Sequence, residues 1–112
     1  MIRNGGQILY ETRGEDFLIF VCGEIDHHSA VAVRTGIDAK LREERPKRVL
    51  LELSQVDFMD SSGLGLIMGR YALVKRYGGA MAVLDPSPAV ARIIALAGME
   101  KMVPIRTSKK KG

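Results

Sequence analysis

Two adjacent serines, Ser61 and Ser62, are the residues of this sequence most suited to chemistry. They lie in the segment "FMDSSGLG", after Asp60 and before Gly63 and Gly65, directly ahead of a periodic apolar stretch. Asp and Ser side chains accept hydrogen bonds from the free N–H groups of a first helical turn, so the segment predicts a helix start. Glycine in a first turn costs about 0.5–1 kcal/mol relative to alanine. Capping alone does not explain the two glycines, which keep the surface around both serines accessible.

An accessible serine at a helix start is a candidate for phosphorylation. A phosphate there would be stabilised by hydrogen bonds from the first-turn amides and by the helix dipole, whereas Asp57 and Asp60 would repel it. These opposed effects predict that the fold tolerates the phosphate and that its main effect falls on a binding partner. The residues alone leave the choice between Ser61 and Ser62 open.

Three polar residues in a second segment, Asp26, His27 and His28, suggest either metal ligands or triad partners for Ser61. Adjacent histidines rarely face one metal unless a third ligand comes from elsewhere, and no cysteine or glutamate cluster offers one. We therefore expect no metal site. The simpler interpretation is that Asp26 or Ser29 caps a helix and that both histidines lie on an exposed rim.

Two enzyme motifs are absent from the sequence because a methionine stands where each of them requires a glycine. Met59 stands where the first glycine of a G-x-S-x-G nucleophile elbow belongs. Met68 stands where the third glycine of a G-x-G-x-x-G loop starting at Gly63 belongs, and no G-K-[ST] follows. We expect a binding module with no catalytic residue and no cofactor. A nucleotide-binding domain and a scaffold subunit of a stress-signalling assembly are the alternatives.

Alternating strands and helices must position these residues. Apolar residues recur every four positions at Val33, Ile37 and Leu41, which is typical of an amphipathic helix. The whole pattern predicts strands at 6–14, 15–26, 48–54, 80–85 and 101–105, and helices at 29–44, from the serines to about 77, and at 86–99. In the last helix, Ser87 is the expected cap and Pro88 the first helical position. The order β-β-α-β-α-β-α-β indicates an α/β domain with a mixed four- to five-stranded sheet whose first strand forms an antiparallel edge. Residues 56–62 and 23–30 then lie in loops after strands, where functional groups gather. Residues 69–71 and 74–79 are expected to be exposed, as a partner surface at most.

The composition fits one globular domain of 112 residues with 46% hydrophobic residues and no stretch long enough to span a membrane. We expect a soluble, cytoplasmic protein. Residues 106–112 contain four of the 17 basic residues and no acid, so the other basic residues equal the 13 acidic residues in number. The net charge of +4 therefore comes from a predicted flexible basic tail, 106–112, behind a neutral domain, 1–105. Neither direct nucleic-acid binding nor membrane binding is expected.

Three segments, "GEIDHHSA", "VDFMDSSGLGLIMGRY" and "SPAVARIIALAGM", together resemble bacterial anti-sigma factor antagonists of the STAS domain family. The resemblance extends from about residue 15 to 105, and the D-S-S-G-L-G segment is most similar to antagonists that act in sporulation. It implies a single STAS-type domain that regulates transcription through a sigma factor. One departure is the segment "IRTSKKKG", which is too short and too polar for the C-terminal helix usual in the family.

The resemblance also implies a mechanism. The unphosphorylated antagonist would bind an anti-sigma factor that is also a serine kinase, and would thereby release a sigma factor. The kinase would phosphorylate Ser61 and end the binding, and a serine phosphatase would reverse the modification. The partner-binding surface would consist of residues around this serine: Asp26, Asp60, Ser62, Gly63 and Leu64.

Overall fold

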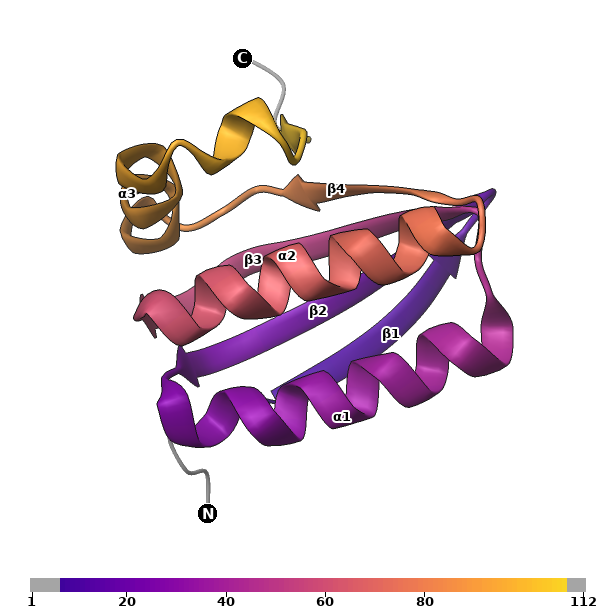
Figure 1. The fold of residues 1–112 in the computed structure, drawn as a ribbon, viewed down its shortest axis with the longest axis horizontal. Helices are drawn as coiled ribbons and strands as arrows, with labels where there is room; N and C mark the ends of the chain where they lie inside the picture. Colours follow the sequence, from indigo (N-terminus) through magenta and orange to yellow (C-terminus); the bar gives the residue numbers. More distant parts are fainter. Residues whose placement is uncertain (1–6, 109–112) are drawn as a thin grey trace.

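A computed structural model describes residues 7–108. The elements follow the chain in this order: β1 (Gln7–Arg13), β2 (Asp16–Ile25), α1 (His27–Glu44), β3 (Arg48–Met59), α2 (Ser61–Arg76), β4 (Ala80–Leu84), α3 (Pro88–Ala97), the 3₁₀ helix η1 (Met99–Lys101) and β5 (Ile105–Arg106). This order confirms the predicted α/β domain. The strands form one sheet in the order β1-β2-β3-β4-β5, with β1 antiparallel to β2 and the other neighbours parallel (Figure 1).

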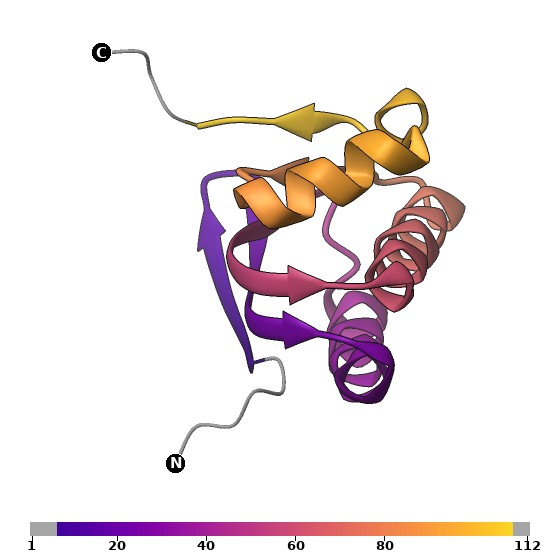
Figure 2. The same cartoon turned by 90° about the vertical axis from the view of Figure 1, so that its left-hand side faces the viewer.

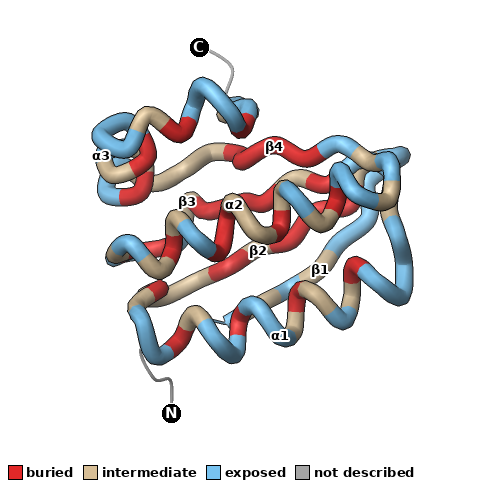
Figure 3. The backbone as a smooth tube through the Cα atoms, viewed as in Figure 1, coloured by how far each residue is buried: buried red, intermediate tan, exposed pale blue. Residues whose placement is uncertain are grey.

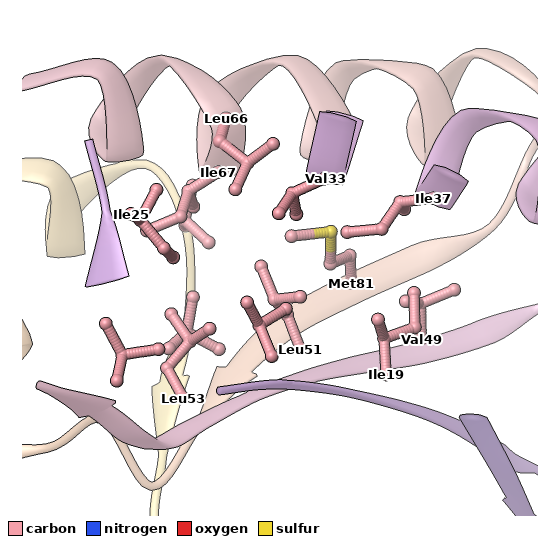
Figure 4. Packing of buried hydrophobic residues seen from close by; sticks show 14 of the residues in the cluster. Ile19, Ile25, Val33, Ile37, Val49, Leu51, Leu53, Leu66, Ile67 and Met81 are labelled. Carbon is pink, nitrogen blue, oxygen red and sulfur yellow. The ribbon is translucent and has the colours of Figure 1, made fainter. Parts of the chain in front are cut away.

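Helices α1 and α2 lie side by side on one face of the sheet (Figures 1 and 2). Their buried side chains, among them Val33, Ile37 and Ile67, pack on the buried residues of β3 such as Leu51 (Figure 4). Burying one such side chain contributes about 1.5–3 kcal/mol. Buried residues recur between exposed ones along both helices (Figure 3), so each helix has one buried stripe that packs on the core.

Strand β3 is longer than predicted. It runs to Met59, so residues 56–59, expected in a loop, belong to the strand. They continue to pair with β2, and the register shifts between Phe20/Cys22 and between Gly23/Glu24, where β3 has one more residue than β2. Gly23 has φ 96°, a conformation that glycine adopts at no steric cost and that suits a bulge. The polar residues after residue 53 conceal this extension in the sequence.

Helix α3 lies beside the part of β3 that extends past β4 (Figure 1). Ser87, the predicted cap of α3, donates its hydroxyl to the carbonyl of Val56 at 2.7 Å, and its amide donates to the carbonyl of Leu53 at 3.2 Å. The second half of β3 thus receives hydrogen bonds from the start of α3 instead of from a neighbouring strand on that side.

Two further boundaries differ from prediction. Helix α1 begins at His27 instead of residue 29. The last strand is Ile105–Arg106 instead of 101–105, because η1 follows Gly98, whose φ of 68° ends α3. Arg106, predicted to start the tail, lies in β5, and residues 109–112 of that predicted tail lie outside the described residues. Among residues 7–108, no helix is both long and apolar enough to cross a membrane.

Candidate functional site

The candidate site lies where β2 and β3 end side by side. Ile25 and Met59, the last residues of these strands, are partners in the parallel register. The amide of the next residue, Asp60, donates a hydrogen bond to the carbonyl of Ile25 at 3.2 Å. Helices α1 and α2 therefore start from neighbouring points, each one residue after an aspartate.

Asp26 caps α1. Its carboxylate accepts hydrogen bonds from the amides of His28 at 2.9 Å and Ser29 at 2.8 Å. The Ser29 hydroxyl accepts from the Asp26 amide at 3.0 Å and donates to the carbonyl of Glu24 at 2.8 Å. Both predicted caps thus act together as a capping box. The hydrogen bond from the Ser29 amide is the main reason that the pKa of Asp26 lies below its ordinary value.

Asp60 caps α2 and leaves Ser61 exposed. The Asp60 carboxylate accepts from the Ser62 amide at 2.8 Å, and the Asp60 carbonyl accepts from the Gly63 amide at 2.9 Å. Ser61 is the first residue of α2, and no described residue hydrogen-bonds to its hydroxyl. Ser62 is half-buried. The two serines therefore differ in access, a difference that their adjacent positions in the sequence do not reveal.

The glycines of α2 have different roles. Gly63 is buried against Met59, and a Cβ at this position would collide with the Met59 side chain. Gly65 and Gly69 face open space, since a Cβ at either position would meet no atom within 4 Å. All three lie inside the helix rather than in a phosphate-binding loop. The prediction that Gly63 and Gly65 keep the surface low holds for Gly65 and is wrong for Gly63, which is buried against Met59.

His27 and His28 are exposed, as predicted. Over the described range 7–108, neither histidine hydrogen-bonds to Ser61 or Ser62. No cluster of three or more His, Cys, Asp or Glu side chains suited to a metal ion occurs in the same range. Leu64, the remaining predicted partner residue, is half-buried and packs against the edge of the core.

The prediction that residues 69–71 and 74–79 are exposed is wrong for Val74, which is fully buried, and for Arg70. The Arg70 side chain is only 9% exposed, and its Nε lies 2.8 Å from Oδ1 of Asp38 on α1. Arg70 belongs to the buried stripe of α2 together with Leu66, Ile67 and Val74. The spacing of these residues is the signal that sequence reasoning missed, because a charged residue within a buried stripe marks a buried ion pair.

Comparisons with known proteins agree with this fold. A mixed sheet with two helices on one face, and an exposed serine at the start of α2, define a small α/β domain of the STAS type. The family model for the STAS domain matches residues 7–112, and the chain belongs to this family. An anti-sigma F factor antagonist from Paenibacillus polymyxa is 39% identical over 99 residues, which cover 88% of this chain and 85% of that protein.

Two solved structures have the same fold. The anti-sigma factor antagonist SpoIIAA in its unphosphorylated form has a TM-score of 0.76 and 26% identity, covering 93% of this chain and 90% of that one. The Bacillus cell fate determinant SpoIIAA in its phosphorylated form has a TM-score of 0.69 and 25% identity, covering 93% of both chains.

Proposed function

We propose that this protein is an anti-sigma factor antagonist whose binding is switched off by phosphorylation of Ser61. The unphosphorylated form binds an anti-sigma factor that is also a serine kinase, and a sigma factor is released. A serine phosphatase restores the active form. The protein works in the cytoplasm by binding and performs no catalysis of its own.

The observation that carries this proposal is the exposure of Ser61 at the first position of α2. A kinase needs a hydroxyl that it can reach, and Ser61 is exposed while Ser62 is half-buried. The similarity to SpoIIAA, which is known in unphosphorylated and phosphorylated forms, supports the same chemistry here. The partner then meets the surface around Ser61, formed by Asp26, Asp60, Ser62 and Leu64, with Gly63 packed beneath it.

The hydrogen bonds of the first turn of α2 indicate that a phosphate on Ser61 acts on partner binding and not on the fold. The amides of Ser62 and Gly63 are already bonded to Asp60, so they are not free to hold a phosphate on Ser61. A phosphate adds roughly −1.5 to −2 charges. Placed beside Asp60, this charge projects toward the partner, and like charges at an interface cost several kcal/mol.

Binding to the anti-sigma factor encoded in the same genome tests the proposal. By titration calorimetry, Ser61→Asp is expected to bind at least tenfold more weakly than the unmodified protein, because it carries a permanent negative charge. Ser61→Ala is expected to keep the affinity and to resist inactivation by ATP. Ser62→Ala is the matched control and is expected to remain switchable. Tight binding by Ser61→Asp would count against the proposal.

A further inference from the structure

A groove of about 450 Å³ runs between α1 and α2 and begins beside the proposed switch. His27 and Arg34 line it from α1, while Ser62 and Arg70 line it from α2. Ser62 directly follows Ser61, so the groove opens within one residue of the proposed phosphorylation site.

Two glycines leave the groove hollow. Gly65 and Gly69 lie in the interior of α2 and line the groove, and a Cβ at either position would meet nothing within 4 Å. Each costs the helix about 0.5–1 kcal/mol relative to alanine. Packing inside this chain does not require these glycines, unlike Gly63, which lies against Met59. The space that they leave is large enough to receive a side chain.

The guanidinium of Arg70 lines this space with unused hydrogen-bonding capacity. Its Nε lies 2.8 Å from Oδ1 of Asp38, and both of these atoms are buried, so the ion pair occupies the Nε side of the guanidinium. One Nη1 bond to the carbonyl of Leu66 is long, at 3.4 Å. Arginine has five N–H donors, and buried polar groups are nearly always hydrogen-bonded. The η nitrogens of Arg70 therefore have N–H donors beyond the ion pair and the long Leu66 bond, and a ligand in the groove could supply acceptors for them.

The charges around Arg70 are predominantly positive. Burial lowers the pKa of Arg70, Asp38 raises it, and the nearby cations Arg34 and Arg42 lower it further. Asp38 is thus one carboxylate among three arginines. The other acids nearby, Asp26 and Asp60, direct their carboxylates to the amides that start the helices. An anion in the groove would relieve the repulsion between the arginines.

The rim of the groove suits a protein better than a free anion. Val31 lines the groove and is 51% exposed, so an apolar surface adjoins the cationic floor. An acidic side chain has an apolar stem and a carboxylate end, and its neighbours in a protein would cover Val31. A free phosphate would leave the valine in water.

We propose that this groove receives an acidic side chain of the anti-sigma factor, whose carboxylate pairs with Arg34 and Arg70. The inference rests on the proposed function and names the chemistry of the partner at that site. It also gives the switch a physical basis. A phosphate on Ser61 stands beside the entrance and repels the incoming carboxylate, so modification and binding exclude each other.

Charge reversal at the exposed Arg34 tests this inference. By titration calorimetry, Arg34→Glu is expected to weaken binding of the anti-sigma factor at least tenfold, and Arg34→Lys is expected to retain most of the affinity. Gly65→Leu, which fills the groove without changing charge, is expected to weaken binding similarly. Lys47→Glu is the matched control, because this exposed lysine precedes β3 at the opposite end of the strand from Asp60. It is expected to bind within twofold of the unmodified protein.

The outcomes separate this inference from the proposed function. If the unmodified protein fails to bind the anti-sigma factor, both fail. If Ser61→Asp weakens binding while Arg34→Glu and Gly65→Leu bind as tightly as the unmodified protein, the function stands and the groove is not the contact. Titration with inorganic phosphate tests the free anion. The inference would be overturned if the unmodified protein bound phosphate saturably and Arg34→Glu did not, while Arg34→Glu still bound the anti-sigma factor with unchanged affinity. The groove would then hold a free anion and not a side chain of the partner.

Discussion

Gly63 lies directly over the side chain of Met59, so the last residue of β3 packs beneath the first turn of α2. Met59 is also the register partner of Ile25. The position of Ser61 therefore depends on a buried contact between a strand end and a helix start. This arrangement places the exposed Ser61 two residues after the buried Met59.

Substitution of Gly63 by alanine is expected to destabilise the fold by about 1–3 kcal/mol, because the added Cβ overpacks Met59. Gly65→Ala is the matched control. It adds the same methyl group to the same helix at an open position, and it is expected to stabilise the protein by about 0.5–1 kcal/mol. Urea unfolding measures both values, and equal effects of the two substitutions would contradict the packing described for Gly63.

The cap of α1 predicts a pH dependence. The pKa of Asp26 is lowered in the folded protein from an ordinary value of 3.8, first by the Ser29 amide. A lowered pKa means that the carboxylate stabilises the fold above the unfolded value and that this stabilisation is lost as the pH falls through the folded pKa. The stability difference between the unmodified protein and Asp26→Ala is therefore expected to be constant above about pH 5. It is expected to shrink below pH 4, and unfolding curves from pH 7 to 2.5 measure it. A difference that grows on acidification would contradict this account.

The ion pair between Arg70 and Asp38 joins α1 to α2. Arg70→Ala is expected to lower the free energy of unfolding by about 3 kcal/mol, because it leaves the Asp38 charge in a largely buried place. The double variant Asp38→Leu, Arg70→Met removes both charges and is expected to recover most of that loss. Chemical unfolding measures each variant. An equal loss in the single and double variants would mean that the unpaired charge is not the cause.

Local signals in the sequence were sufficient for most of the fold. The spacing of Val33, Ile37 and Leu41 predicted the buried stripe of α1, and Ser87 with Pro88 predicted the start of α3. The aspartate and serines predicted the start of α2. Each of these features depends on residues within one or two helical turns, which is why the sequence alone reveals them.

The remaining features depend on contacts between distant segments. Residues 56–59 continue β3 because β2 and the start of α3 lie on either side of them, although their own composition favours a loop. The same reason applies to Arg70, whose burial requires a carboxylate from α1. The greater exposure of Ser61 than of Ser62 depends on how α2 packs against its neighbours, and adjacent residues of one type give no sequence signal for it.

The most direct test of the Ser61 switch is peptide-level mass spectrometry after incubation with ATP and the anti-sigma factor, followed by a binding measurement on the product. The account predicts one added phosphate on Ser61 and loss of the complex, with complex formation restored by a serine phosphatase. Phosphate on Ser62 alone, or a complex that persists with Ser61 fully phosphorylated, would contradict it.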